Sequence, residues 1–210
     1  DTQLAELNNE LVAMGALCEN AIASAVKALL GGDVKLAAAA IRIDHEIDRK
    51  EREIESMCLK LLLQQQPVAS DLRLISSVLK MITDIERFGD QASDIGDIVY
   101  TMPGDKYIKK LTHITAMGDL AVKMARDSVN SFICNDEKLA DEVIRTDDQM
   151  DDLFITVKNE LIECIKENSQ NGDQAIELMM IAKYLERIGD HAVNVAEWTK
   201  YNETGVHQKF

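Results

Sequence analysis

The sequence predicts an all-α protein built from two tandem antiparallel three-helix bundles. Two observations predict this class: residues that favour long helices dominate the composition, and the second half of the chain repeats the pattern of the first. Only 10 Gly and 2 Pro occur in 210 residues, whereas 46% of the residues are hydrophobic. Few helix breakers and many apolar residues favour long helices around a core over turn-rich β architectures.

The repeat is defined by a nearly fixed offset between similar segments. The tripeptide Ala-Met-Gly at 13–15 recurs at 116–118, an offset of 103 residues. The segment Glu-Arg-Phe-Gly-Asp at 86–90 recurs as Glu-Arg-Ile-Gly-Asp at 186–190, an offset of 100 residues. A deletion of three residues from the second copy, at the connection that corresponds to 64–70, explains why the offset falls from 103 to 100.

Helix-breaking residues set the expected helix ends. Pro103 and Gly104 separate the two copies, and Pro67 interrupts the first copy before its third helix. Short connections favour antiparallel neighbours. We predict a first repeat at 1–102, a second repeat at 105–201 and a C-terminal tail at 202–210. The expected helices span about 3–30, 34–65, 69–101, 105–134, 137–168 and 173–201.

The charge of the chain limits its partners. Lys and Arg number 23 and Asp and Glu 37, which gives a net charge of −14. We see no basic stripe in the sequence, so we expect no nucleic-acid binding and favour cations or a basic protein as partners. No apolar run approaches the roughly 18 residues of a spanning helix, and the first residues show no signal-peptide pattern. We therefore expect a soluble cytoplasmic protein without a membrane span.

The four cysteines are far apart and lie among apolar helical residues. Cys18, Cys58, Cys134 and Cys164 form no C-x-x-C pair. We interpret them as small buried hydrophobic residues in a reducing compartment, and not as partners in a disulfide or as zinc ligands.

Carboxylate pairs spaced four residues apart occur at equivalent places on the second and third helices of both repeats. The pairs are Asp44 and Asp48, Glu86 and Asp90, Asp147 and Asp151, and Glu186 and Asp190. Residues at this spacing share one helix face, and an antiparallel bundle can bring two pairs together. About six such pairs arise from composition alone, so a single pair would be a solvated surface. Equivalent pairs in both copies instead indicate crowded carboxylates that a cation would compensate.

Two glycines accompany these pairs. Gly89 and Gly189 lie inside segments that otherwise favour helix strongly. Each glycine destabilises its helix by about 1 kcal/mol relative to Ala. We expect a neighbouring helix or a ligand to approach the backbone closely at both positions. The adjacent Arg87 and Arg187 are expected to form salt bridges with nearby acids.

The ligand type indicates hard metal ions. Carboxylate oxygens favour Mg²⁺, Mn²⁺, Ca²⁺ or iron and leave zinc possible, and bridging carboxylates permit a multinuclear cluster in each repeat. Asp94 and Asn194 lie one helical turn further along the same faces, where we expect additional ligands or groups that support the ligands. His45 and His191 lie about 100° around the helix from the neighbouring Asp, so we expect both on the surface.

The sequence resembles the PhoU family of phosphate-uptake regulators. The resemblance rests on the tandem segments ERFGD and ERIGDHAVNVAEW and on LLLQQQPVASDLRLISSVLKMITDIERFGD, and it covers essentially the whole chain. It implies two three-helix bundles, metal ions or clusters held by the eight paired carboxylates, and frequent homodimerisation. It also implies action with the nucleotide-binding subunit of a phosphate ABC transporter and with a sensor histidine kinase, and negative regulation of phosphate uptake and phosphate-starvation signalling.

Three classes of function follow. The first is a non-catalytic regulatory adaptor whose metal-bearing faces help it bind membrane-associated partners. The second is a metal-dependent hydrolase or oxidase, which the lack of a Ser, Cys or His arranged as nucleophile or base makes the weaker hypothesis. The third is a structural bundle whose acidic pairs are simply solvated.

Overall fold

The computed structural model describes residues 2–64, 69–102 and 106–205 and consists, within these ranges, of α-helices and one short 3₁₀ turn. The helices are α1 (Thr2–Gly31), α2 (Val34–Gln64), α3 (Ala69–Thr101), α4 (Thr112–Ile133), α5 (Glu137–Glu167) and α6 (Gly172–Thr204), and the 3₁₀ turn η1 (Ser169–Asn171) precedes α6. The all-α prediction is confirmed. The expected breaks at Pro67 and Pro103 lie outside the described residues.

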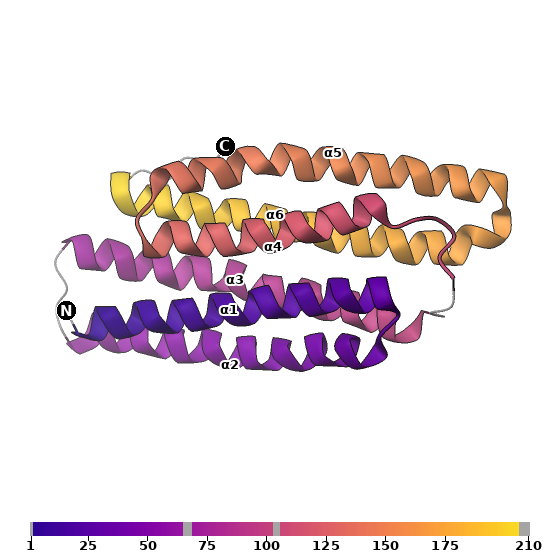
Figure 1. Ribbon diagram of the computed structural model, residues 1–210. Coiled ribbons are helices and arrows are strands. Elements are labelled where there is room, and N and C mark those ends of the chain that lie inside the picture. The colour runs from indigo at the N-terminus through magenta and orange to yellow at the C-terminus, as the bar shows by residue number, and fades with distance from the viewer. Residues whose placement is uncertain (1, 65–68, 103–105, 206–210) are drawn as a thin grey trace.

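The helices form two antiparallel three-helix bundles side by side (Figure 1). Helices α1–α3 make up the first bundle and α4–α6 the second, as the repeat predicts. The bundles meet through α1 against α4 and α3 against α6, whereas α2 and α5 lie on the outer sides (Figure 1). The molecule is therefore elongated, because each helix of about 30 residues is about 45 Å long.

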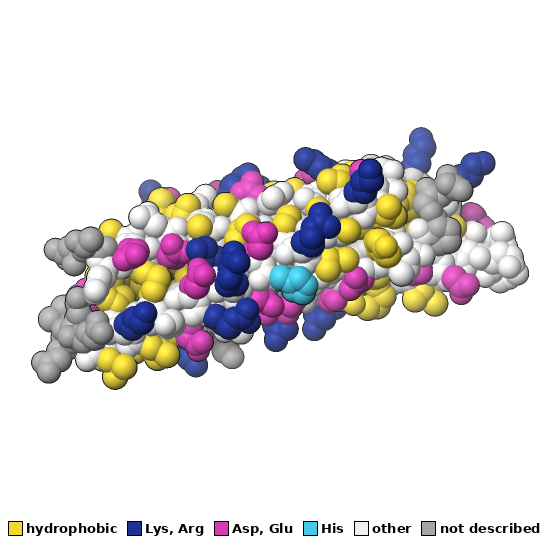
Figure 2. Space-filling model, turned by 90° about the horizontal axis from the view of Figure 1, so that it is seen from below, with side chains coloured by type: hydrophobic (Ala, Val, Ile, Leu, Met, Phe, Trp, Pro, Cys, Tyr) yellow, Lys and Arg dark blue, Asp and Glu magenta, His cyan; other side chains and the backbone are white. Residues whose placement is uncertain are grey.

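The outer side of the first bundle carries a shallow groove lined by charged residues of both signs. A groove between α1 and α2 is lined by Glu10, Arg49, Arg52, Glu53, Ser56, Met57 and Lys60. Figure 2, which views the molecule from the side of α2, shows Lys and Arg side chains among the acidic ones on this surface. Basic and acidic side chains alternate here, so the surface is of mixed charge rather than a basic stripe. We call this surface the α2 groove.

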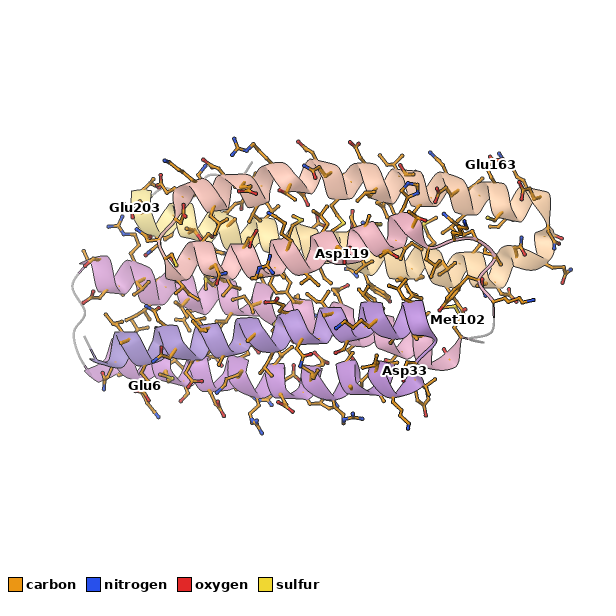
Figure 3. The ribbon with its side chains drawn as sticks, viewed as in Figure 1. Glu6, Asp33, Met102, Asp119, Glu163 and Glu203 are labelled. Atoms are coloured by element: carbon orange, nitrogen blue, oxygen red, sulfur yellow. The ribbon has the colours of Figure 1, made fainter. Side chains whose placement is uncertain are left out.

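Matching caps begin the second helix of each repeat. Asp33, labelled in Figure 3 at the turn before α2, accepts hydrogen bonds on Oδ1 from the backbone N–H groups of Lys35 and Leu36 at 2.9 and 3.2 Å. Asp136 accepts one from Leu139 N–H at 3.0 Å before α5. Such caps satisfy backbone donors that have no partner within the helix. The two aspartates are related by the 103-residue offset, so the repeat extends to the capping chemistry.

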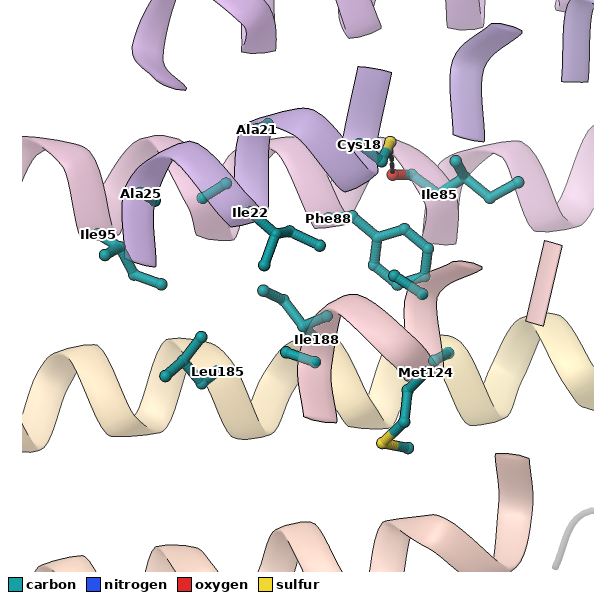
Figure 4. Close-up of a cluster of buried hydrophobic side chains, with 14 of the residues drawn as sticks. Cys18, Ala21, Ile22, Ala25, Ile85, Phe88, Ile95, Met124, Leu185 and Ile188 are labelled. Carbon is teal, nitrogen blue, oxygen red and sulfur yellow. Dashed lines mark hydrogen bonds between the residues drawn. The ribbon is translucent and has the colours of Figure 1, made fainter. Parts of the chain in front are cut away.

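The two bundles share one continuous core. Gly15 of α1 lies against Val129 of α4, where a Cβ would be 3.1 Å from Cγ1, and Gly118 of α4 lies against Val26 of α1, where a Cβ would be 2.8 Å from both Cγ atoms. These contacts are reciprocal because each pair is related to the other by the repeat. Phe88 of α3 is fully buried near the centre of the interface with Ile188 and Met124 (Figure 4).

The connection between the repeats differs from the prediction. We expected a helix from about residue 105, but α4 begins at Thr112, and residues 106–111 run along the second bundle without forming a helix. We call residues 106–111 the strap. Gln174 of α6 binds it through two hydrogen bonds: Oε1 accepts from Ile108 N–H at 2.6 Å, and Nε2 donates to the carbonyl of Lys106 at 3.1 Å. Tyr107 Oη donates to the carbonyl of Leu29. At the other end, α6 continues to Thr204, inside the expected tail, and stops at Gly205 with φ of 72°.

Two further expectations were tested by burial. Cys18 and Cys58 are buried as expected, but Cys134 is exposed and Cys164 half-buried, because both lie near helix ends, so the prediction was wrong for these two. Helix α1 is long and apolar enough over Gln3–Gly31 to cross a membrane by length and composition. Half of that apolar stretch is buried inside the protein, as in the core helix of a bundle.

Candidate metal centres

Each repeat brings its two carboxylate pairs to one surface between its second and third helices. In the first repeat α2 supplies Asp44 and Asp48 and α3 supplies Glu86 and Asp90; we call these four the first cluster. In the second repeat α5 and α6 supply the equivalent second cluster, which consists of Asp147, Asp151, Glu186 and Asp190. In both clusters carboxylates from both helices are close enough to alter one another's protonation.

The two glycines allow the helices to approach at these clusters. A Cβ on Gly89 would lie 2.6 Å from Oδ1 of Asp44 and 2.8 Å from Cδ1 of Ile47. A Cβ on Gly189 would lie 2.9 Å from Oδ1 of Asp147. Any larger residue would therefore displace a cluster carboxylate, and the expected close approach of a neighbouring helix is confirmed at both positions.

Burial and mutual repulsion hold protons on the first cluster. Burial, and after it the charges of Asp48 and Asp90, raise the pKa of Asp44 to about 6. Burial also raises the pKa of Glu86 to about 7, with Asp90 as the strongest charged contributor. A carboxyl group with a pKa this high lacks enough hydrogen-bond donors or positive charges to stabilise its ionised form.

The second cluster behaves in the same way. Burial is the main cause that raises the pKa of Asp147 to about 7. The charges of Asp151, Asp190 and Glu186 contribute to the same rise. The pKa values of Asp151 and Asp190 are also raised, first by burial and then by Glu186. Carboxylates from two helices therefore raise one another's pKa values in the second cluster.

Each cluster also contains a buried carboxylate oxygen without a hydrogen-bond partner and one basic side chain that neutralises a carboxylate. Oδ1 of Asp44 and Oδ1 of Asp147 are buried and make no hydrogen bond with any described residue. Arg87 Nη1 lies 2.5 Å from Oδ2 of Asp90, and Lys183 Nζ lies 2.5 Å from Oε2 of Glu186. The predicted salt bridges of Arg87 are thus confirmed.

The chemistry of the clusters fits a hard cation, although the side chains do not surround one point. Unpartnered carboxylate oxygens with raised pKa values are suited to such an ion. However, no group of three or more His, Cys, Asp or Glu side chains in residues 2–64, 69–102 and 106–205 converges closely enough to hold a metal as it stands. Asp90 and Glu186 face Arg87 and Lys183 instead.

A polar contact that the sequence analysis missed joins α3 to α6. Oδ1 of Asp84 lies 2.9 Å from Nδ1 of His191 and accepts a hydrogen bond from Nδ2 of Asn194, also at 2.9 Å. The prediction of a surface position was wrong for His191, whose side chain is 22% exposed, and is confirmed for His45, which is exposed. Asn194, expected beside the ligands, is hydrogen-bonded to Asp84. No spacing within α3 could indicate Asp84, because both partners come from the other repeat.

A groove of about 590 Å³ opens between the repeats beside the first cluster. It is lined by Asp44, Arg87, Asp90, Gln91, Ser93, Asp94, Arg187 and His191, and we call it the inter-repeat groove. Burial raises the pKa of Asp94, as do the charges of Asp90 and Asp97, and the guanidinium of Arg187 partly offsets this. Asp94 therefore lies next to the first cluster, as the sequence predicts.

Comparison with known proteins gives consistent matches over nearly the whole chain. A family model described as the PhoU domain matches residues 11–99 and again residues 114–199. The phosphate-specific transport system accessory protein PhoU homolog of Clostridium acetobutylicum is 36% identical over 206 residues, which cover 98% of this chain and 94% of that protein. The homolog of Aquifex aeolicus is 36% identical over 185 residues, which cover 88% of this chain and 84% of that protein.

Solved structures show the same architecture. The crystal structure of PhoU from Pseudomonas aeruginosa superimposes with a TM-score of 0.93 at 32% identity and covers 98% of this chain and 99% of that one. The structure of the phosphate transport system regulatory protein PhoU from Streptococcus pneumoniae superimposes with a TM-score of 0.91 at 27% identity and covers 100% of this chain and 99% of that one.

Proposed function

Because the chain belongs to the PhoU domain family, we propose that it is a metal-binding, non-catalytic adaptor that negatively regulates phosphate uptake. Its relatives are named as accessory or regulatory proteins of phosphate transport. We propose a cytoplasmic homodimer that binds the nucleotide-binding subunit of a phosphate ABC transporter and a sensor histidine kinase. These partners account for a regulatory effect on both uptake and phosphate-starvation signalling.

The buried, unpartnered carboxylate oxygens of the two clusters support the metal-binding part of this proposal. Oδ1 of Asp44 and Oδ1 of Asp147 are acceptors without donors, and such a group costs about 1–3 kcal/mol when it stays unsatisfied. The first cluster would hold one ion or ion group and the second cluster another. Iron, Mn²⁺, Mg²⁺, Ca²⁺ or Zn²⁺ would supply positive charge and coordination positions for an oxygen ligand from a partner.

Arg87 and Lys183 are the groups that a metal ion would displace. Each neutralises one carboxylate of its cluster at 2.5 Å, and each is a flexible surface side chain that can turn toward solvent. Freed of these contacts, Asp90 and Glu186 become available to an ion together with the carboxylates of the facing helix. Metal binding would thus exchange a salt bridge at the surface for a cation shared by two helices.

Co-purification and metal analysis together test this proposal. We expect protein dialysed against Mn²⁺ and then desalted to retain metal and to bind the purified transporter subunit. Replacement of Glu86 and Asp90 by Ala should remove the metal of the first cluster and abolish binding. Glu163 and Glu167 form an exposed acidic pair with the same spacing on α5, and their replacement by Ala should change neither. Undiminished binding by a folded Glu86→Ala, Asp90→Ala variant would remove the clusters from the docking surface.

The raised pKa of Glu86 also supports a second candidate, a metal-dependent hydrolase. A carboxyl group with a pKa of about 7 suits a general acid or base near neutral pH. Phosphoester turnover by the Mn²⁺-loaded protein that disappears in Glu86→Gln would favour this enzyme over the adaptor.

A further inference from the structure

The outer surface of the second bundle carries a group of exposed apolar side chains. Helix α5 lies on the outer side of the molecule (Figure 1), and its Ile155, Ile162 and Ile165 are 49%, 40% and 37% exposed. On α6, Ile176 and Met180 are 62% and 40% exposed. Single exposed apolar residues are common on protein surfaces, whereas a contiguous group marks an interaction site. We call these five residues the α5–α6 surface.

The five side chains lie together because α5 and α6 are antiparallel neighbours. Lys183 of α6 lies over the ring of Phe154 of α5, with Nζ 5.4 Å from the ring centroid. From this contact, Ile162 lies about two turns further along α5, and Ile176 lies about two turns back along α6. Antiparallel helices keep these positions side by side, so the α5–α6 surface extends from the Phe154 contact toward the η1 turn.

The first repeat is more polar at the equivalent positions. A three-helix bundle of this kind therefore folds without apolar residues at these exposed places, and the second repeat has another reason to carry them. Ile155, Ile176 and Met180 correspond to Arg52, Ser76 and Lys80, whereas Ile162 and Ile165 correspond to Leu59 and Leu62.

The apolar residues of α5 complement themselves when a second copy of the chain approaches in the opposite direction. In a contact about a two-fold axis, each residue that faces a second one is faced by it in return. An axis between Lys158 and Asn159 places Ile155 opposite Ile162 of the second copy, because the two isoleucines are equally far from the axis. The same isoleucine pair then forms twice.

The charged residues at the two ends of this stretch also match. Asp152 is exposed near one end, and Lys166 is exposed near the other end on the same side of α5. In the antiparallel arrangement Lys166 faces Asp152 of the second copy. Its ion pair with Glu163, at 2.7 Å on the exposed surface, contributes little and does not prevent this. Lys158, beside the axis, keeps its ammonium group in solvent because its aliphatic stem is long.

We propose that two copies of this chain associate through the α5–α6 surface, with α5 packed antiparallel against α5 of the second copy. The isoleucines supply the apolar contact, and Asp152 and Lys166 fix the register. The stretch between these two charges is about 20 Å long, and the apolar residues of α6 widen it toward the roughly 800 Å² per partner of a stable interface. The net charge of −14 disfavours an anionic membrane as the occupant. This inference rests on the homodimer proposed above and assigns its interface.

Sedimentation velocity over a range of protein concentrations tests this interface. We expect wild-type protein to be a dimer and Ile162→Asp to raise the dissociation constant at least about thirtyfold, because the contact would bury an unpaired charge. Leu59→Asp is the matched control at the equivalent, equally exposed place in the first repeat, and it should remain a dimer. Both positions are exposed, so neither change removes a core contact.

Cross-linking and charge reversal test the antiparallel register. In a background of Cys134→Ser and Cys164→Ser, Asn159→Cys should form a disulfide-linked dimer when diamide oxidises the two thiols, because the axis brings the two copies of residue 159 together. Ser56→Cys, exposed at the equivalent position of the first repeat, should stay unlinked. Lys166→Glu should weaken the dimer, and a further Asp152→Lys in the same chain should restore it.

The possible failures are distinguishable. A monomeric wild-type protein would overturn both this inference and the homodimer, but not the adaptor role, which metal analysis and co-purification test separately. A dimer that persists in Ile162→Asp, or that Leu59→Asp disrupts equally, would show that copies meet through another face. If Ile162→Asp is monomeric but Asn159→Cys does not cross-link and the charge reversal does not restore the dimer, the antiparallel α5 pairing is wrong. Monomeric protein that binds phosphatidylglycerol vesicles through Ile162 would assign the surface to a membrane instead.

Discussion

Replacing Asp147 by Asn removes one charge from the second cluster, and we expect the metal-free protein to become more stable at pH 8. The pKa of Asp147 is raised in the folded protein from 3.8 to about 7. Between these values the folded state holds more protons than the unfolded state, so stability falls as pH rises through this range. Asn resembles the protonated carboxyl group and avoids this loss.

The size of the effect follows from the shift. About 1.4 kcal/mol per pKa unit gives about 4 kcal/mol for the full shift of Asp147. Because Asp151 and Asp190, whose pKa values are also raised, adjust their own protonation when one charge is removed, we expect about half of this, or about 2 kcal/mol at pH 8. For a protein of this length that corresponds to a rise in Tm of about 4–8 °C. At pH 5, where Asp147 is already mostly protonated, the gain should be less than half as large.

Thermal unfolding followed by circular dichroism in EDTA at pH 5 and pH 8 measures this gain. Asp148→Asn is the matched control, because Asp148 is exposed on the same helix, and its free energy of unfolding should change by no more than about 0.5 kcal/mol. If Asp147→Asn is no more stable than wild type at pH 8, or gains equally at both pH values, burial and the charges of the second cluster do not raise the pKa of Asp147.

Three further outcomes are expected. Mn²⁺ should raise Tm more at pH 8 than at pH 5, because the ligands bind metal in their ionised forms; an equal rise at both pH values in calorimetric scans would contradict this. Gly89→Ala should lower the free energy of unfolding by about 1 kcal/mol, since overpacking of about 1–3 kcal/mol exceeds the helix-propensity gain of about 1 kcal/mol. Gly172→Ala, with no atom within 4 Å of the new Cβ, should lose nothing in the same urea titration. Asp84→Ala should cost about 1 kcal/mol by loss of the hydrogen bonds from His191 and Asn194, and unchanged unfolding would show that this contact does not stabilise the interface.

The fold could be predicted because its signals are local. The start of α2 after Asp33 and that of α5 after Asp136 were both predicted, and capping aspartates that bond to the first-turn backbone mark them. The prediction of a helix from residue 105 was wrong because long-range contacts determine the structure there. The strap at 106–111 has no strong breaker of its own, and its backbone groups instead bond to Gln174, which is far away in sequence.

The clusters could be predicted only in part. The four-residue spacing indicated which acids share a helix face, and Gly89 indicated a close approach to the backbone, which Asp44 of the neighbouring helix makes. The spacing could not indicate that Arg87 turns to Asp90 at 2.5 Å, because Arg87 has several acids within reach on its own helix and the neighbouring one. The choice among them depends on side-chain rotamers, which the sequence pattern does not specify.

The position of each group relative to the interface between the repeats explains where the two halves differ. Asp44 and Asp147 each lie over a glycine of their own repeat, so the geometry of a single bundle fixes both contacts, and both halves have them. Asp84 and His191 meet only because α3 of one repeat crosses α6 of the other. Exchanging the roles of the repeats replaces this pair with Tyr184 and Gln91, which cannot make the same contact. Gln91 therefore keeps an unpaired acceptor in the inter-repeat groove, whereas His191 and Asn194 are hydrogen-bonded to Asp84, so the two repeats present different polar groups where they meet.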